Sequence, residues 1–416
     1  MFRVFSIPVR FFIALLIYFS WGPLAGGVVT APVPEFSSPA LIPYPSKVVR
    51  GAGEAGFRSV QVKVGPDVPG RDDLMKEIKD IFRTSGIQGS LNSGGAAEGA
   101  MTWELFPDAR MKGEGYDLSV GLGKATVRAG SFGGFFNALQ TLRQLVFNRE
   151  GEFAMPVVRI SDKPAFVLRG VMLDVGRYYM SPALIKEVMR RLSRYKINTL
   201  HLHLTDDPAW RMEVKKYPAL TDGAFHWKSR LPGRFYTQAQ LKDLTDYCAR
   251  LNIQVIPEID MPGHSQPFAR AMKTGMQTEK GVSILKDVVD EAVSLFPGRF
   301  FHMGSDEAHI SMKDFIPRMA EHIRGKGKEV VVWSPGGPHD KDSVLMCWGE
   351  NEAGARMDKN MKRIDSNGFY IDWADSQSGV YQVFFQQPCE VPQGDDKALG
   401  AIMPVWCDGN LSSERR

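Results

Sequence analysis

The sequence predicts an α/β fold in which a (β/α)8 TIM barrel follows a small α+β domain. After Asp162-Lys163-Pro164, short apolar strands alternate with amphipathic helices, and eight such strands occur before the chain ends. Polar and aromatic residues stand at the C-terminal end of nearly every strand, which is the face where barrel enzymes place their chemistry. Before that point, strands and helices mix without regular alternation, as in an α+β module.

Length and charge limit the size class and the partners of the protein. With 416 residues the chain is long enough for one large and one smaller domain. Its formal net charge is +4 and it has no long basic block, so nothing in the composition favours nucleic acid as a partner. We divide the chain into a signal peptide over 1–31, an α+β domain over 32–160 and a barrel over 161–416.

The first residues have the pattern of an export signal. Arg3 and Arg10 precede or border an apolar run over 11–19, which is too short for a comfortable transmembrane span. Small residues at 25–27 and 30–31 offer cleavage sites. We therefore expect an exported protein, periplasmic or secreted and bacterial rather than lysosomal, with no stable membrane insertion after cleavage. An uncleaved membrane anchor is the alternative.

The elements of the α+β domain follow from periodicity. Residues 57–64 alternate as in a strand, and 71–84 carry apolar side chains at helical spacing. Segments 116–120 and 125–129 flank Gly121-Leu122-Gly123 and predict a hairpin. An amphipathic pattern over 135–146 predicts the last helix of this domain.

The barrel elements follow in strand and helix order. Ser181 as N-cap and Pro182 at the first helical position start a helix over 182–195. The other predicted helices cover 237–251, 283–295, 314–324 and 353–362. The predicted strands cover 170–175, 199–204, 254–260, 300–303, 329–333, 343–348, 368–372 and 399–406. The chain ends ten residues beyond Trp406, so we expect the last helix of the barrel to be missing.

Two adjacent carboxylates, Asp306 and Glu307, follow the strand over 300–303 after a Gly-Ser break. Neighbours within a strand point to opposite faces, but at a strand end the backbone turns and both can face a cleft. Two carboxylates that share a cleft push their pKa values apart, which makes one of them an acid at neutral pH. The alternative is a solvated pair in a loop.

A second cluster of polar residues lies in and just after the strand predicted over 199–204. His201 and His203 lie two residues apart, so both side chains share a strand face, and Asp206 and Asp207 follow. This spacing is compatible with zinc, which would indicate a metallohydrolase. The other reading is a polar network that orients neighbouring groups. The four cysteines form no Cys-x-x-Cys pair, so no structural zinc site is predicted and their pairing stays open.

Four ordered motifs on successive strands resemble the β-N-acetylhexosaminidases of glycoside hydrolase family 20. They are RGVMLDVGRY over 169–178, HLHLTDD over 201–207, PEIDMPGH over 257–264 and HMGSDE over 302–307. The module before the barrel is similar to the α+β domain that usually precedes it in that family. The resemblance runs from about residue 40 to the end.

The resemblance implies an exo-acting enzyme that removes terminal β-linked N-acetylglucosamine or N-acetylgalactosamine from glycans or chitin fragments, without a cofactor or metal. The implied mechanism retains the anomeric configuration and uses the substrate's 2-acetamido group as nucleophile, an exception to the two-carboxylate scheme. Glu307 would be the acid and later the base. Asp306 would hold the acetamido N–H, and Tyr370 would orient the acetamido oxygen.

The resemblance also implies roles for residues at other strand ends. Trp333, Trp348 and Trp406 would wall the acetamido pocket, because sugars and methyl groups pack on indole faces. A guanidinium fork suits a vicinal pair of hydroxyls, so Arg177 would bind those at carbons 3 and 4. The implied ligands of the 4- and 6-hydroxyls are Asp372 and Asp408. The implied supports of the two acids are Asp206, Asp260, His264 and His302.

Two residues depart from the pattern of the family. Ser305 stands where the signature has its second glycine, and Asp408 stands where the family has Glu. Together with the short C-terminus, they motivate a second hypothesis, a carbohydrate-binding member of the family with impaired catalysis. The sequence leaves the preferred sugar and the oligomeric state open.

Overall fold

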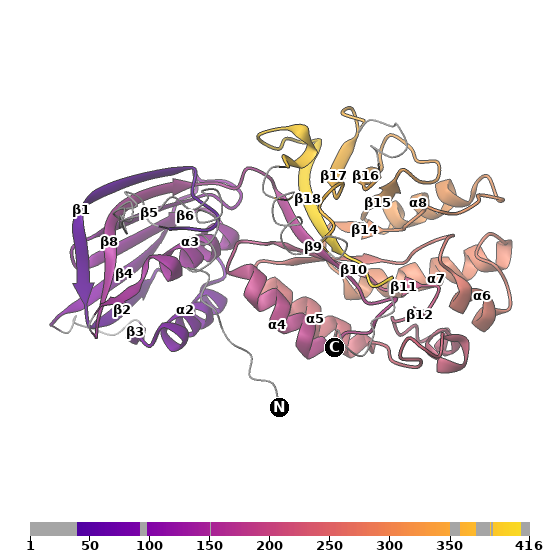
Figure 1. The fold of residues 1–416 in the computed structure, drawn as a ribbon, viewed down its shortest axis with the longest axis horizontal. Coiled ribbons are helices and arrows are strands. Elements are labelled where there is room, and N and C mark those ends of the chain that lie inside the picture. The colour runs from indigo at the N-terminus through magenta and orange to yellow at the C-terminus, as the bar shows by residue number, and fades with distance from the viewer. Residues whose placement is uncertain are drawn as a thin grey trace, which may run out of the picture. The chain divides into compact units, whose positions relative to one another are not determined.

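A computed structural model describes residues 40–91, 98–149, 151–349, 358–371, 383 and 386–408. These residues belong to one compact unit, Pro39–Arg416, which begins with an α+β domain and continues into a barrel (Figure 1). The predicted signal peptide lies outside the described residues. None of the helices in the described part of the chain is long and apolar enough to cross a membrane.

The small domain is a single mixed sheet with two helices. Its strands pair in the order β1-β8-β5-β6-β4-β2-β3, with β7 beside β8. Helix α3 packs against β5, β6 and α2. The strands are β1 (Lys47–Phe57), β2 (Ser59–Val64), β3 (Gln88–Leu91), β4 (Ala100–Pro107), β5 (Tyr116–Gly121), β6 (Lys124–Ala129), β7 (Phe147–Arg149) and β8 (Glu152–Asp162). The helices are α2 (Arg71–Ser85) and α3 (Phe132–Leu145).

Eight parallel strands close the barrel in the order β9-β10-β13-β14-β15-β16-β17-β18. Apolar side chains such as Met172, Ile256 and Val331 fill its interior, so the barrel centre is a packed core. The strands are β9 (Leu168–Asp174), β10 (Thr199–His203), β13 (Gln254–Glu258), β14 (Phe300–His302), β15 (Glu329–Ser334), β16 (Val344–Cys347), β17 (Lys362–Asp365) and β18 (Ala398–Val405).

Side-chain caps fix the starts of three barrel helices, which begin at Pro182, Gln238 and Glu279. Ser181 accepts the Leu184 N–H, and Thr237 forms a capping box with Gln240. The helices are α4 (Pro182–Ser193), α5 (Gln238–Arg250), α6 (Gln266–Met272), α7 (Glu279–Leu295) and α8 (Phe315–Gly325). Shorter elements are β11 (Thr205–Asp206), β12 (Ala209–Trp210), η1 (Pro218–Thr221), η2 (Gly223–Phe225) and η3 (Pro388–Glu390).

The prediction of the seventh barrel strand over 368–372 is wrong. Strand β17 occupies this place in the barrel, and residues 366–371 follow it as turn and loop. The predicted helix over 353–362 is also wrong at its end, because residues 358–361 are not helical and Lys362 begins β17; residues 353–357 lie outside the described part. The strand was missed because it contains Arg363 and Asp365, and charged residues are rarely buried unless they are paired. The Cys389 N–H donates to Asp365 at 2.7 Å.

Candidate active site

The carboxyl ends of the barrel strands surround a cavity of about 240 Å³. Most of the site residues predicted from the sequence converge there from the ends of β9, β13, β14, β15, β16 and β18 and from the loop after β17. Asp206 and His302 are not part of the lining and instead contact Arg177 and Glu258. Asp372 lies outside the described residues. The cavity is lined by Arg177, His203, Asp260, His264, Asp306, Glu307, Trp333, Trp348, Tyr370, Trp406 and Asp408.

A tight turn after β14 brings Asp306 and Glu307 to the same cavity. Gly304, Ser305 and Glu307 have φ angles of 69°, 87° and 49°, so the backbone leaves the strand geometry immediately. Glycine is required at the first of these positions, because a Cβ on Gly304 would lie 1.8 Å from Asp260 Oδ1. The turn thereby explains why adjacent acids do not point to opposite faces.

The two acids differ in their surroundings. Burial first, and then the negative charges of Asp260 and Glu258, raise the pKa of Asp306 to about 8. Glu307 is exposed at the mouth, with a side-chain exposure of 58%. Asp306 therefore keeps its proton near neutral pH, and Glu307 faces solvent.

His264 connects the acid pair to a buried aspartate. Its Nδ1 lies 2.8 Å from Asp260 Oδ2, and its Nε2 lies 3.4 Å from Glu307 Oε2. The hydrogen bond to Asp260 raises the pKa of His264 to about 9 against the effect of burial. His264 is therefore an imidazolium at neutral pH, placed to hold Glu307 at the mouth.

Aromatic side chains make the apolar wall of the cavity. The rings of Trp333 and Trp406 have centroids 5.6 Å apart, and Tyr370 meets Trp406 edge-on at 6.4 Å. The indole N–H of Trp348 donates to Pro335 O at 3.0 Å. This wall can pack an acetamido methyl group or a sugar face.

Arg177 stands among three carboxylates beside this wall. Its nitrogens lie 3.1 Å from Asp174, 2.9 Å from Asp206 and 2.9 Å from Asp408. Burial works to lower the pKa of Arg177, but these three charges outweigh it and raise that pKa. The guanidinium also lies over the Trp406 ring at 5.0 Å. Its orientation is therefore set before any ligand binds.

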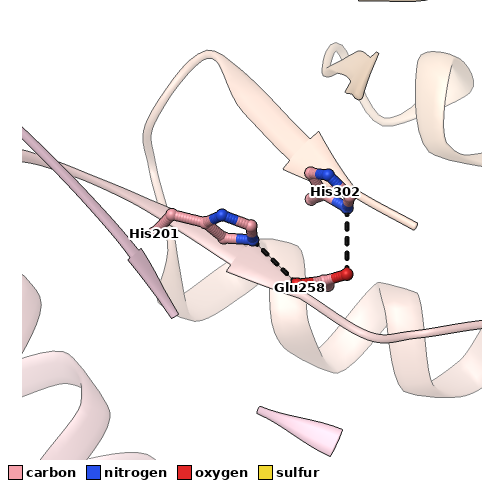
Figure 2. Close-up of side chains that lie close together, drawn as sticks. All are labelled: His201, Glu258 and His302. Atoms are coloured by element: carbon pink, nitrogen blue, oxygen red, sulfur yellow. Dashed lines mark ion pairs between the residues drawn. The ribbon is translucent and has the colours of Figure 1, made fainter. Parts of the chain in front are cut away.

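Beneath the cavity floor, Glu258 is enclosed by three histidines and an indole. Figure 2 shows His201 and His302, from β10 and β14 on either side of β13, approaching its carboxylate. His203 Nδ1 lies 2.6 Å from Glu258 Oε2, and the Trp333 N–H donates to Oε1 at 2.7 Å. Burial acts to raise the pKa of Glu258, but the charge of His203, together with the contacts from His302 and His201, holds it well below its usual value.

His203 carries the charge that balances this buried carboxylate. Its second nitrogen lies 3.0 Å from Asp206 Oδ2, so both ring nitrogens face carboxylates and donate. Burial lowers the pKa of His203, yet Glu258 and Asp206 raise it well above its usual value. Neutral His201 differs, because burial lowers its pKa to about 4.

Three groups of the described residues have metal-ligating atoms close together, namely His201, Glu258 and His302; His203, Asp206 and Asp260; and Asp260, His264 and Asp306. The predicted alternative required His201, His203, Asp206 and Asp207 to act as one set, and the structure divides them. His302 Nδ1 accepts the Gly304 N–H at 3.0 Å, and Asp207 accepts the Gln266 N–H at 3.2 Å. Most donor atoms thus already have protein partners, which favours the polar-network reading.

Three contributors were not predicted to line or support this cavity, although the sequence suggested His203 as a zinc ligand or a member of a polar network. His203 lines the cavity, Glu258 holds Trp333, and Asp174 orients Arg177. All three stand at the last position of their strands, β10, β13 and β9. A charged residue that ends an apolar strand was therefore the available signal, and it marks the catalytic face of a barrel.

Comparisons with known proteins identify relatives of this chain. Residues 166–280 match the model of the glycosyl hydrolase family 20 catalytic domain, and residues 38–163 match domain 2 of the same family. A β-hexosaminidase from Porphyromonas gingivalis is 30% identical over 382 residues, covering 73% of this chain and 49% of that protein. A β-N-acetylhexosaminidase from Cellulomonas fimi is 30% identical over 286 residues, covering 62% of this chain and 58% of that protein.

The same likeness extends to solved structures. A mutant β-hexosaminidase from Streptomyces plicatus, in complex with the product GlcNAc, is 26% identical with a TM-score of 0.75. The match covers 88% of this chain and 85% of that one. The chain spans about half to two thirds of the length of the curated relatives it matches first. Two adjoining domain matches and the shared fold show that the chain belongs to glycosyl hydrolase family 20.

Proposed function

We propose that this protein is an exo-acting β-N-acetylhexosaminidase. It would hydrolyse terminal β-linked N-acetylglucosamine or N-acetylgalactosamine from glycans or chito-oligosaccharides with retention of configuration. The observation that carries the proposal is the convergence of Asp306 and Glu307 on one cavity walled by three tryptophans and Tyr370. An aromatic wall beside an acid pair suits a sugar that carries an acetamido group.

The size of the cavity supports exo action. Its volume of about 240 Å³ lies below the range of about 300–1,000 Å³ that is typical of small-molecule sites. A cavity of this size suits one terminal sugar residue. The rest of the glycan then lies outside the cavity, beyond the exposed carboxyl of Glu307.

The placement of the carboxylates supports the substrate-assisted route. In the usual retaining scheme, two carboxyl groups about 5–5.5 Å apart flank the scissile bond. Here Asp306 and Glu307 leave one turn together, and Asp408 is engaged by Arg177. The acetamido oxygen of the substrate would therefore attack the anomeric carbon while the glycosidic C–O bond breaks. Glu307 would protonate the leaving oxygen.

The second step restores the enzyme. The ionised Glu307 takes a proton from water, and the hydroxyl attacks the anomeric carbon. The bond to the acetamido oxygen breaks, the product keeps the β configuration, and Glu307 is again protonated. Asp306 would accept a hydrogen bond from the acetamido N–H. Because such a bond and the cation of the intermediate both favour the charged carboxyl, substrate would lower the raised pKa of Asp306.

Names of relatives support the substrate class. The Streptomyces plicatus enzyme was solved with GlcNAc, and a Vibrio harveyi relative that is 28% identical over 272 residues is named N,N'-diacetylchitobiase. We propose chito-oligosaccharides or N-acetylhexosamine-ended glycans as substrates. The basic start and apolar run before residue 20 support export to the periplasm or the medium.

The test is hydrolysis of p-nitrophenyl β-N-acetylglucosaminide by wild type and Glu307→Gln, each with and without EDTA. Loss of a general acid lowers kcat by about 100-fold or more, and a cofactor-free route resists the chelator. Glu279→Gln is the matched control, because Glu279, the first residue of α7, is an exposed carboxylate that pairs with Arg318 of α8. It should retain wild-type kcat.

Two outcomes would contradict the proposal. Folded wild type that binds N-acetylglucosamine without turnover would favour the carbohydrate-binding hypothesis, which the ion pair between Asp408 and Arg177 also motivates. Turnover that EDTA abolishes and metal restores would favour the metallohydrolase.

A further inference from the structure

A loop over residues 222–236 is built as a rigid rim, and we name it the rim loop. It is held from beneath by Arg211, which is fully buried. Arg211 donates to the carbonyls of Leu231 at 2.9 Å, Arg234 at 2.7 Å and Arg230 at 2.6 Å. Its Nε also donates to Val175 and Gly176, just after β9. The loop is thereby fastened to the strand end that precedes Arg177.

The rim loop contacts both sides of the cavity mouth. At one side, the Trp227 indole N–H donates to Gln266 Oε1 at 3.3 Å, two residues beyond His264. At the other side, Arg230 donates to the carbonyls of Cys407 at 2.9 Å and Asp408 at 2.8 Å. Since His264 and Asp408 both line the cavity, the loop borders its opening.

Two large apolar side chains of this rim face solvent. Trp227 is 37% exposed and Leu231 is 40% exposed, although their backbone is held on both sides. Trp227 is the most exposed tryptophan of the described chain, because Trp348 and Trp406 are only partly accessible and the others are buried. An indole that stays exposed while its N–H is fixed presents its ring ready for a ligand, at little cost in side-chain entropy.

We infer that Trp227 is a platform for the leaving group, namely the second sugar residue of the substrate. The inference rests on the proposed function. The cavity suits one sugar, so the next sugar must lie at its mouth, on the side of the acid that protonates the shared oxygen. Glu307 lies beside His264, and Trp227 is fixed to the same segment through Gln266. Leu231 lies towards the Asp408 side and is the same-loop control.

The experiment compares two substrates that differ in the leaving group. N,N'-diacetylchitobiose leaves a sugar that can stack, and methyl β-N-acetylglucosaminide leaves methanol, which has no ring. For Trp227→Ala we expect KM for the disaccharide to rise about two- to twelvefold, since aromatic packing contributes about 0.5–1.5 kcal/mol. Kinetics with the methyl glycoside should be unchanged. Trp227→Phe should retain most of the affinity.

Controls separate stacking from loop damage. Leu231→Ala should match wild type on both substrates. Trp227→Gln, which keeps a polar group for Gln266 but has no ring, should repeat the loss of Trp227→Ala. Equal losses on both substrates would overturn the inference in favour of a structural role, and unchanged KM for the disaccharide would exclude the platform. Wild type that turns over neither substrate would overturn the proposed function itself, and the platform with it.

Discussion

Ser305 occupies a backbone conformation that suits glycine. Its φ is 87°, its side chain is fully buried, and its hydroxyl has no hydrogen-bond partner among the described residues. A left-handed conformation costs an L-residue about 1–2 kcal/mol, and an unpaired buried polar group costs about 1–3 kcal/mol. The position therefore stores strain in the turn that presents the two acids.

We expect Ser305→Gly to raise the free energy of unfolding by about 1 kcal/mol, since glycine relieves both costs but loses chain entropy. Urea denaturation measures it. Ser366→Gly is the matched control, because Ser366 is equally buried but its hydroxyl donates to Cys347 O at 2.9 Å. It should destabilise by about 1 kcal/mol. A loss of stability in Ser305→Gly would show that the hydroxyl is satisfied.

Asp306 and His264 make the stability of the protein depend on pH. The folded-state pKa values of Asp306 and His264, about 8 and about 9, both lie above the ordinary values of 3.8 and 6.5. The folded protein thus binds more protons than the unfolded chain, and the free energy of unfolding falls as pH rises. The contribution of Asp306 is lost from about pH 4 through 8, and that of His264 from about 6.5 through 9.

We expect the melting temperature to fall between about pH 6 and pH 9, and to fall less in Asp306→Asn, which cannot ionise. Differential scanning calorimetry across this range measures both slopes. Asp287→Asn is the control, because hydrogen bonds from Lys216 and Tyr217 lower the pKa of Asp287. Asp287 therefore changes the pH dependence of stability only at acid pH, and the slope between about pH 6 and pH 9 should match wild type. If the melting temperature fell equally with pH in Asp306→Asn and in wild type, Asp306 would not be the group with the raised pKa.

At the scale of elements, one polar chain crosses the ends of four barrel strands. It runs from Trp333 on β15 to Glu258 on β13, to His203 on β10, to Asp206, and to Arg177 beyond β9. Opposite charges alternate along it, so each buried ion has a partner. The aromatic wall and the guanidinium are therefore held by one connected structure.

Glu258→Gln should break this chain. The substitution removes one of the two carboxylates that pair with the buried His203 imidazolium and leaves only Asp206. We therefore expect the free energy of unfolding to fall by about 3–5 kcal/mol. Glu329→Gln is the control, because Glu329 begins β15 at the other end of the barrel and pairs at the surface with Lys362. Its loss should stay under about 1 kcal/mol. Equal losses in urea denaturation would refute the buried-pair account.

Element prediction succeeded where periodicity was clean. Seven of the eight predicted strands overlap strands of the observed barrel, because their apolar runs are bounded by turn residues. It failed at β17, where Lys362-Arg363-Ile364-Asp365 resembles a surface segment and only tertiary pairing buries Arg363 and Asp365. Strands β3, β4, β7 and β8 of the small domain were not predicted, and the predicted strand over 57–64 includes only the last residue of β1.

At the scale of the whole molecule, the sequence could not show how the two domains meet. Glu114 of the small domain accepts hydrogen bonds from Arg169, Asn198 and Asn252. These partners begin or precede β9, β10 and β13, so the small domain is attached at the N-terminal ends of the strands. Contacts over 138 residues of separation leave no local signal.

The same limit applied to the site. Motifs on four strands were enough to predict Asp306, Glu307, His264 and Arg177 as neighbours, because parallel strands end at one edge. The left-handed turn at Gly304, by contrast, emerges only when Asp260 from the next strand is seen to fill the space of a Cβ. A constraint between residues that are far apart in the sequence, such as Asp260 and Gly304, can be seen only in the folded chain.

Arg211 binds main-chain carbonyl groups of the rim loop, and this affects how the loop can evolve. All of its hydrogen bonds in the described structure go to main-chain oxygens. The path of the loop therefore does not depend on which side chains it displays at positions such as Trp227 and Leu231. Selection can replace those side chains, and so retune which glycans are accepted, while the chemistry of the cavity is inherited unchanged.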